Sequence, residues 1–210
     1  MKPNNLKHFI FVRYNLGLYT DNVYNIEDPD EYMRLRLPMF KRLMESIKNQ
    51  TIDHEAEVLV SVDVNTPEHL FLDVAMVCTQ YGAKIIYHAH DDYLIDQQIE
   101  EDWLLTSRID NDDEYYPDFF EKLYSYINSK PREELILDAQ GAKERNGKVT
   151  LTPRDYPNSP FISLLEPSNQ RKTVFYGKAH TQVPLHFKCE WISEEPLTKV
   201  HLHGSNAYYK

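Results

Sequence analysis

The sequence predicts an α/β fold with a central, mostly parallel sheet flanked by helices and a mixed or antiparallel C-terminal part. Two observations support this prediction. Strand-like and helix-like patterns alternate over the first 90 residues, which is typical of a doubly wound parallel sheet. After Pro131 the pattern changes to short strand-like runs separated by turns, which favours mixed or antiparallel pairing.

The first half supplies the strands that we expect at the centre of the sheet. Residues 8–13 (HFIFVR), 57–64 (EVLVSVDV) and 84–88 (KIIYH) are mostly apolar, as in strands buried on both faces. Apolar residues spaced by three or four predict a helix over residues 30–48, and Pro38 is expected to divide it into two pieces.

A second helix is predicted between the last two of these strands. Thr66 is placed to cap it and Pro67 to occupy its first position. The helix is expected to end at Tyr81, because Gly82 suits the left-handed conformation that follows many helices.

An acidic segment, DNDD at residues 110–113, follows a fourth predicted strand at residues 103–109. Pro117 then opens a helix with one apolar face, so the acidic segment lies at a strand-to-helix turn. In open α/β sheets, ligands bind beyond the carboxyl ends of the strands. The later strands are predicted at residues 135–139, 149–152, 161–165, 173–176 and 200–203.

Composition and charge exclude several classes of protein. The 210 residues suffice for one domain with its own core, and no linker marks a second. A net charge of −10 opposes nucleic acid as a partner, and no apolar run approaches the roughly 20 residues of a membrane span. The polar start and two isolated cysteines, Cys78 and Cys189, favour a cytoplasmic protein with reduced thiols.

The carboxylates of Asp110, Asp112 and Asp113 repel one another unless a cation or solvent relieves them. Mg²⁺ or Mn²⁺ held by one or two carboxylates keeps positions open for phosphate oxygens, which suits a nucleotide diphosphate. The alternative is a solvated acidic turn before the next helix, whose dipole favours negative charge. The strand before the cluster favours the metal site, because ligands gather there.

Two other metal motifs match only in part. The acidic segment has carboxylates at several EF-hand positions, but Tyr115 stands where that loop requires glycine. Residues 88–93 (HAHDDY) are similar to a signature of binuclear metallohydrolases, with Tyr93 in place of its last histidine. We interpret this segment as a polar loop or as part of a nucleotide pocket.

Two histidines end the last predicted strand. His201 and His203 are two residues apart, so both are expected on one face of the strand. Either could supply a nitrogen ligand to a metal held by Asp110 and Asp112. The alternative is a pair of surface histidines near the end of the chain.

Several segments, in order along the chain, together resemble the GT-A class of nucleotide-sugar glycosyltransferases. These are FVRYN at 11–15, EVLVSVDVNT at 57–66 and TSRIDNDD at 106–113, the last resembling the D-x-D segment of that class. More narrowly, the sequence is similar to a rhamnosyltransferase family and to the small glycosyltransferase domain of large algal viruses. The segments for this are RIDNDD at 108–113, FISLLEP at 161–167, YGKAHT at 176–181 and HGSN at 203–206.

The resemblance implies a GT-A-like fold over residues 1–210, with a nucleotide-binding half at 1–130 and an acceptor-side half at 131–210. It also implies a UDP-sugar donor, a glycan or glycoprotein acceptor, and Mn²⁺ or Mg²⁺ on the diphosphate. In a viral relative the location would be the host cytoplasm. The chain is shorter than larger relatives, so it could be one module of a longer polypeptide.

The resemblance assigns roles to individual residues. The expected metal ligands are Asp110, Asp112, Asp113 and either His203 or His201; the expected donor-binding residues are Arg13, Tyr14, Asn15, Asp63, Arg108, Asp110, Lys178 and His180. An inverting enzyme also needs a carboxylate base, for which Glu166 is the first candidate and Asp138 the second. The alternative is a retaining enzyme, which can rely on a phosphate oxygen of the donor in place of that base.

The predicted function is therefore metal-dependent transfer of rhamnose or a related hexose from a UDP-sugar to a glycan. Two alternatives stay open. A metal-dependent phosphoester hydrolase or nucleotidyl transferase could use the same acidic cluster. A non-catalytic carbohydrate- or calcium-binding module could use the 15 tyrosines as stacking surface.

Overall fold

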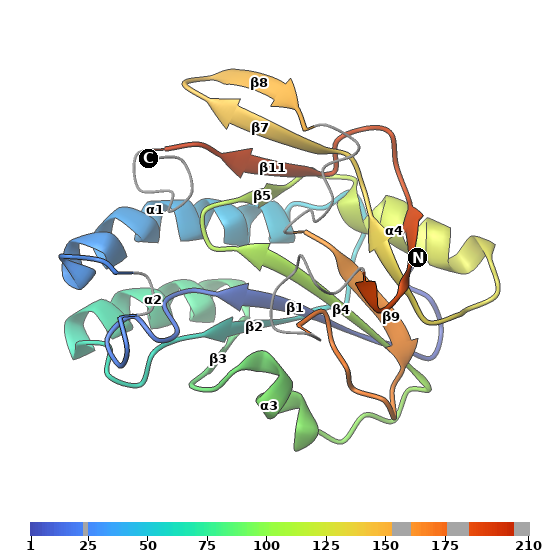
Figure 1. Cartoon of the computed structure of the whole chain (residues 1–210), viewed down its shortest axis with the longest axis horizontal. Coiled ribbons are helices and arrows are strands. Elements are labelled where there is room, and N and C mark those ends of the chain that lie inside the picture. Colours follow the sequence, from blue (N-terminus) through green and yellow to red (C-terminus); the bar gives the residue numbers. More distant parts are fainter. Residues whose placement is uncertain (23–24, 153–160, 176–184, 204–210) are drawn as a thin grey trace.

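The strand order of the larger sheet fixes where a ligand can bind. A computed structural model describes residues 1–22, 25–152, 161–175 and 185–203 (Figure 1). Its seven-stranded sheet has the order β10-β6-β9-β4-β1-β2-β3. The bounds are β1 Leu6–Arg13, β2 Glu57–Ser61, β3 Lys84–Ile86, β4 Trp103–Asp110, β6 Leu135–Asp138, β9 Ser163–Pro167 and β10 Lys188–Trp191.

Strand β9 is antiparallel to both of its neighbours, β4 and β6, and the other neighbouring pairs in this sheet are parallel. The parallel strands therefore end at one side of the sheet, which we call the carboxyl edge. Strand β9 ends at the opposite side.

A second, four-stranded sheet has the order β5-β11-β7-β8. Its strands are β5 Glu114–Tyr115, β7 Gly141–Arg145, β8 Lys148–Leu151 and β11 Thr198–His201. Helix α1, Pro29–Lys48, lies between this sheet and strands β1 and β2 (Figure 1). The acidic segment joins the two sheets, because β4 ends at Asp110 and β5 begins at Glu114.

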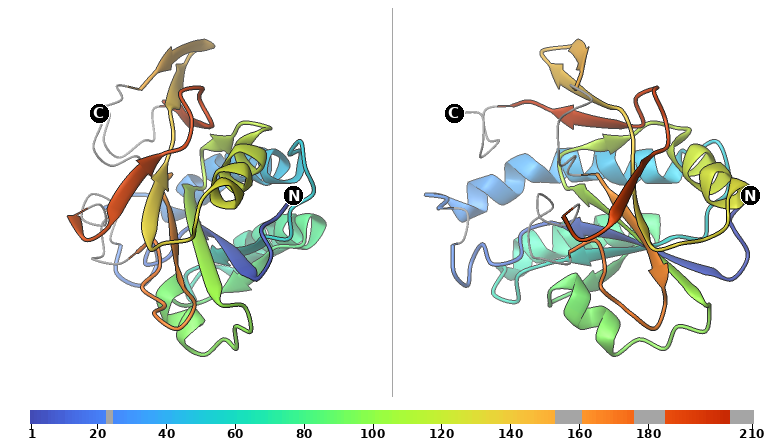
Figure 2. Two further views of the ribbon diagram at one scale, coloured as in Figure 1. Left: turned by 90° about the vertical axis from the view of Figure 1, so that its right-hand side faces the viewer. Right: turned by 45° about the vertical axis from the view of Figure 1, so that its right-hand side comes forward.

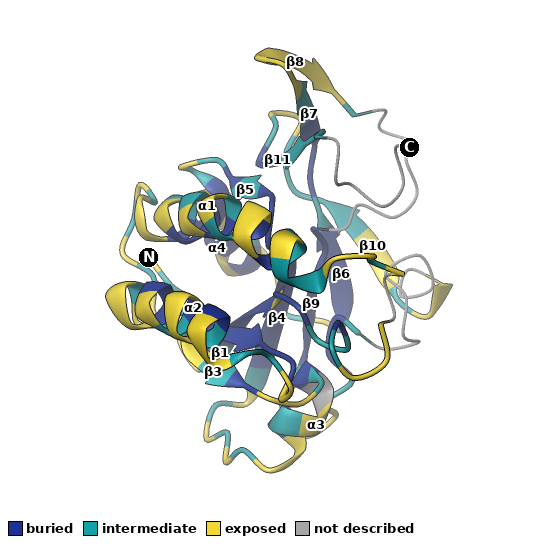
Figure 3. Cartoon of the chain, turned by 90° about the vertical axis from the view of Figure 1, so that its left-hand side faces the viewer, coloured by how far each residue is buried: buried dark blue, intermediate teal, exposed yellow. Residues whose placement is uncertain are grey.

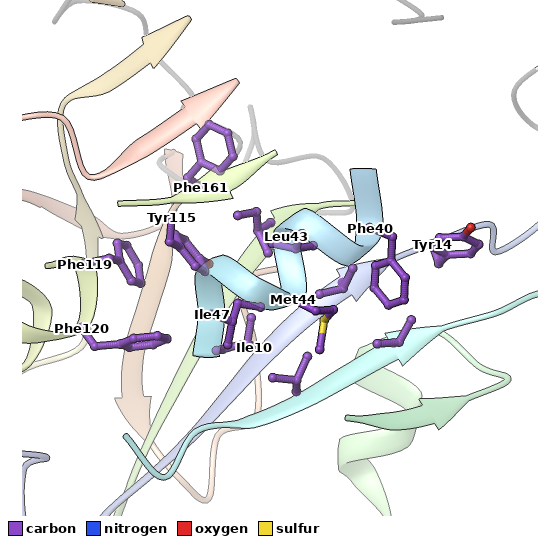
Figure 4. Close-up of a cluster of buried hydrophobic side chains, with 14 of the residues drawn as sticks. Ile10, Tyr14, Phe40, Leu43, Met44, Ile47, Tyr115, Phe119, Phe120 and Phe161 are labelled. Carbon is purple, nitrogen blue, oxygen red and sulfur yellow. The ribbon is translucent and has the colours of Figure 1, made fainter. Parts of the chain in front are cut away.

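Three helices cover one face of the larger sheet. These are α1, α2 (Glu68–Tyr81) and α4 (Phe119–Ser129), and Figure 3 shows α1 and α2 side by side. Their buried faces join the main core, in which Phe40 packs against Tyr14, and Phe119 packs against Tyr115 and Phe120 (Figure 4). The short helix α3, His90–Ile95, lies below the sheet in Figure 1, and its Leu94 belongs to a smaller core. No described helix is long and apolar enough to cross a membrane.

The alternation predicted for the first half is confirmed, with differences at two helices. Helix α1 is continuous through Pro38, which is exposed, so the carbonyl left without an N–H partner can meet water. Buried Met33 and Phe40 on either side hold both halves of the helix against the sheet. Helix α2 begins at Glu68, and Thr66 does not cap it but donates its hydroxyl to the Asp63 carbonyl at 2.6 Å. Gly82 adopts φ +71°, as predicted.

The C-terminal half is mixed, as predicted, but its elements differ in detail. Residues 173–175 form no strand, and Thr173 has φ +59°, which a strand cannot contain. Residue 176 lies outside the described residues. Strands β5, β7 and β10 and helix α3 were not predicted from the sequence; Figure 2 shows the hairpin of β7 and β8 projecting from the rest of the fold. These four elements are short or polar, so their hydrophobic periodicity is weak.

His90 belongs to the smaller core rather than to a polar loop. The centroid of its ring lies 4.6 Å from that of Phe11 and 5.2 Å from that of Phe175, and the ring contacts the Ser61 hydroxyl at 3.0 Å. The polar-loop interpretation of residues 88–93 is therefore wrong at His90. A histidine enclosed in this way is not available as the ligand that a metallohydrolase would need.

His90 should make the fold sensitive to acid. Burial lowers its pKa from 6.5 to about 3, so the unfolded chain binds a proton more readily than the folded chain. Stability present above pH 6.5 should therefore fall as the pH drops toward 3, by up to about 1.4 kcal/mol per pH unit. Urea unfolding of wild type and His90→Phe between about pH 7 and about pH 5 tests this, and the variant should show the smaller slope. An equal slope in both proteins, or a similar change in the exposed-site control His69→Phe, contradicts the assignment.

Candidate functional site

The acidic segment lies at the carboxyl edge, where α/β sheets bind ligands. In the register of the parallel strands β1 and β4, Arg13 is the partner of Asp110. The Asp110 side chain is 40% exposed and accepts a hydrogen bond from Arg108 Nη2 at 3.3 Å. Asp110 is therefore the carboxylate of the cluster that a ligand can reach directly.

Asp112 is held between the side chains of Arg36 and His203. Its side chain is 8% exposed, and its Oδ2 contacts both Arg36 Nη1 of α1 and, at 3.0 Å, His203 Nε2. Burial alone would raise the pKa of Asp112, but the His203 hydrogen bond and the Arg36 charge lower it. The carboxylate is thus held in its charged form.

Asp113 is the most enclosed of the three carboxylates. Its Oδ1 accepts a hydrogen bond from the His201 backbone N–H at 3.1 Å. Burial and the neighbouring charges of Asp112 and Asp110 raise the pKa of Asp113 well above its ordinary value. Asp113 therefore ties β11 to the acidic segment and offers no open face to a ligand, which departs from its predicted role as a metal ligand.

Asp112 and His203 fit a divalent cation. A carboxylate and an imidazole nitrogen are both ligands of Mn²⁺, and the two side chains already meet at the carboxyl edge. Within the described ranges, no three His, Cys, Asp or Glu side chains converge on one position. Two protein ligands are enough for a cation whose other positions are filled by phosphate oxygens and water.

His201 faces a different set of carboxylates, so the expectation that both histidines share one face is wrong. Its Nε2 lies 2.6 Å from Glu114 Oε1, and its Nδ1 lies 3.6 Å from Glu144 Oε2. Strand β11 ends at His201, so His203 is outside the pleat that would have aligned the two rings. The imidazole of His201 is occupied within the smaller sheet.

Glu166 cannot be the catalytic base of a site at the carboxyl edge. Strand β9 is antiparallel to β4, so Glu166 pairs with Leu104, six residues before Asp110 in β4. That offset corresponds to roughly 20 Å along the strand. Glu166 is fully buried and accepts backbone N–H groups of Lys172 and Thr173, each at 2.9 Å. Its role is structural, because it satisfies a buried turn.

Asp138 lies at the correct edge. Strand register aligns Ser107 of β4 with Ser163 of β9, and Ser163 with Leu137 of β6. The next residues, Arg108 and Asp138, are therefore level, two strands or about 10 Å apart, and project from the same face. Asp138 is partly exposed and accepts the Ala139 backbone N–H at 2.8 Å.

Three of the residues predicted to bind the donor, Asp63, Tyr14 and Asn15, build the turn after β1. Both oxygens of Asp63 accept hydrogen bonds, from Thr20 and from the backbone N–H groups of Tyr19 and Asn65. These bonds outweigh the effect of burial and lower the pKa of Asp63.

The two residues that follow β1 are used in the same way. Tyr14 is buried and donates its hydroxyl to the Met33 carbonyl at 3.3 Å. Asn15 accepts the Asp63 N–H and donates to the Thr66 hydroxyl. Their side-chain groups therefore shape the turn, and their contacts with the donor stay a prediction.

Two of the predicted basic residues lie at the carboxyl edge. Arg13 is exposed at the end of β1, whereas Arg108 is buried with its guanidinium 5.4 Å from the Phe175 ring. Arg108 pairs with Asp110. Lys178 and His180 lie outside the described residues, as does most of the YGKAHT and HGSN segments.

Arg36 is a site residue that was not predicted from the sequence. Besides Asp112, it donates to Asn111 Oδ1 at 3.0 Å, and Asn111 donates to the Tyr14 carbonyl at 2.6 Å. The sequence did contain a signal for this role. Met33 precedes Arg36 by three residues and Phe40 follows it by four, so all three lie on one face of the helix. A charged residue on an apolar helical face indicates a buried partner.

The fold is similar to that of solved structures of S. aureus TarS. TarS 1-349 in complex with UDP-GlcNAc aligns with a TM-score of 0.58 and 13% identity over 96% of this chain and 60% of that chain. A second structure of TarS 1-349 gives 0.57, with 15% identity over 93% and 60% of the two chains. A longer TarS structure gives 0.54, with 14% identity over 93% and 37%.

These alignments show a GT-A-like α/β fold. The chain spans 60% of the length of the TarS 1-349 structures. No protein-family model and no curated protein matches the sequence.

Removing Arg36 should destabilise the protein, because Asp112 would lose its main cationic partner within the core. Breaking a buried ion pair from one side typically costs about 3 kcal/mol. We expect Arg36→Met to lower the free energy of unfolding by roughly that amount, measured by urea denaturation. Arg34→Met, on the exposed side of the same helix, is the matched control and should change little. Equal effects of the two substitutions would show that the Arg36 pair is not a major source of stability.

Proposed function

We propose that the chain is a metal-dependent glycosyltransferase that moves a hexose from a UDP-sugar to a glycan or glycoprotein acceptor. One observation carries the proposal: Asp112 and His203 meet at the carboxyl edge of a GT-A-like sheet. The alignment with TarS in complex with UDP-GlcNAc supports a uridine nucleotide as the donor. The resemblance of the sequence favours rhamnose or a related hexose as the transferred sugar.

Asp112 and His203 would hold the Mn²⁺ or Mg²⁺ ion, and Asp110 would contact the ion or the ribose of the donor. When bound, a divalent cation stabilises the negative charge that develops on a diphosphate leaving group. Arg36 keeps the Asp112 carboxylate fixed and charged. Arg13 and Arg108 place positive charge on the same edge, where it can meet the donor phosphates.

Asp138 is the proposed general base. A carboxylate that accepts the proton of an acceptor hydroxyl lets its oxygen attack the anomeric carbon as the bond to the diphosphate breaks. Asp138 shares its edge and face of the sheet with Arg108, about 10 Å away, so both can contribute to one site. We propose Asp138 in place of Glu166, which lies at the other end of the sheet.

Donor binding should depend on the metal. Calorimetric titration of UDP, GDP and CMP with Mn²⁺ present should show binding of UDP, and EDTA should abolish it. Asp112→Asn should weaken UDP binding in Mn²⁺ by about a hundredfold, because a neutral amide is a poor ligand for a hard cation. Asp73→Asn, the same change at an exposed position on α2, should bind UDP normally.

Two results would count against the glycosyltransferase. If no nucleotide binds while Mn²⁺ or Ca²⁺ does, a binding module becomes the better explanation. If a phosphoester is turned over without a sugar acceptor, the acidic cluster belongs to a hydrolase or nucleotidyl transferase.

Asp138 and Glu166 should respond differently to neutralisation. Asp138→Asn should retain UDP binding but slow sugar transfer by about a hundredfold or more, because it loses proton acceptance alone. Glu166→Gln should lower the unfolding midpoint and leave the transfer rate of the folded fraction nearly unchanged. Transfer to a panel of glycans, measured as UDP release at saturating donor, separates these outcomes. If folded Glu166→Gln lost sugar transfer while Asp138→Asn kept the wild-type transfer rate, Glu166 would be the base and Asp138 would not.

A further inference from the structure

A cavity of about 330 Å³ lies between the C-terminal half of α1 and strands β5 and β11, and none of Asp110, Asp112 and Asp113 lines it. Figure 1 shows these elements facing each other. The lining includes Arg42 and Glu45 from α1 and Asn49 directly after it, and Glu114, Tyr116 and Lys199 from the β5 region and β11. The volume is at the small end of the range for small-molecule sites, roughly 300–1,000 Å³.

The charges around this cavity are already balanced. Glu114 lies 2.6 Å from Arg42 Nε and 3.3 Å from Lys199 Nζ, and Lys199 also lies 3.3 Å from Glu144. Glu45 adds a further carboxylate to the wall. The lining therefore has no excess of positive charge to attract a phosphate, and its carboxylates oppose an anionic ligand.

The same lining contains both donors and acceptors of hydrogen bonds. Arg42, Lys199 and the Asn49 amide can donate, whereas Glu114 and the Asn49 carbonyl can accept. Sugar hydroxyls both donate and accept, so they can bond to such a wall without a net charge. Tyr116 supplies an aromatic ring for the apolar face of a sugar.

We infer that this cavity binds one or two neutral sugar residues of a glycan. The identification of the ligand as a glycan rests on the proposed function. The site is separate from the donor region, because Asp112 and Asp110 do not line it. It would hold a segment of the acceptor away from the transfer site, and so raise the local concentration of acceptor ends.

The test is a titration that does not depend on turnover. Neutral trisaccharides (maltotriose, cellotriose and chitotriose) and, separately, inorganic phosphate are added to ¹⁵N-labelled protein, with the amide signals of Asn49, Tyr116 and Lys199 followed by NMR. At least one trisaccharide should shift these signals. Asn49→Trp fills the cavity from an exposed helix end and should weaken that binding by about tenfold or more. Lys41→Trp, exposed on the same helix and outside the lining, should bind as the wild type does.

The inference is overturned if none of the trisaccharides shifts the cavity signals, if phosphate alone does, or if both tryptophan variants bind alike. A parallel UDP titration separates it from the proposed function, because Asn49→Trp should leave UDP binding unchanged. Failure of UDP to bind the wild type would refute the proposed donor without altering the trisaccharide result.

Discussion

The site depends on how a GT-A-like sheet keeps three neighbouring carboxylates together at one edge. The negative charges of Asp110, Asp112 and Asp113 repel one another and would destabilise the segment if nothing offset them. The fold offsets the charge of each carboxylate in a different way. Asp110 remains partly in water beside Arg108, and Asp112 is bound by Arg36 and His203. Asp113 has a raised pKa and is enclosed under β11. Helix α1 and strand β11 are therefore both tied to the site by electrostatics as well as by packing.

Strand direction then decides which residues can act together. All strands that end at the carboxyl edge contribute side chains to one region, however distant they are in sequence. Asp138 lies in that region because β9 is antiparallel to both of its neighbours, so β6 runs in the same direction as β4. Glu166 lies outside that region because β9 runs in the opposite direction, although both carboxylates lie near the ends of short strands.

The first half of the fold could be predicted from the sequence, because long buried strands and amphipathic helices carry strong periodicity. The acidic segment at the end of β4 and the left-handed Gly82 followed from the same local signals. The direction of β9 is a tertiary property, so Glu166 was misplaced. The separation of His201 from His203 depends on where β11 ends, and strand ends are the least predictable feature of a sequence.

Strand β9 also has a consequence for biogenesis. Strand β6 is synthesised before β9, yet its partners in the sheet are β9 and β10, both later in the chain. Until β9 emerges from the ribosome, the apolar residues Leu135, Ile136 and Leu137 have no strand to join. A nascent chain halted in that interval would present an unpaired apolar strand, which is a template for aggregation. Co-translational chaperones would have their greatest effect on this protein during that interval.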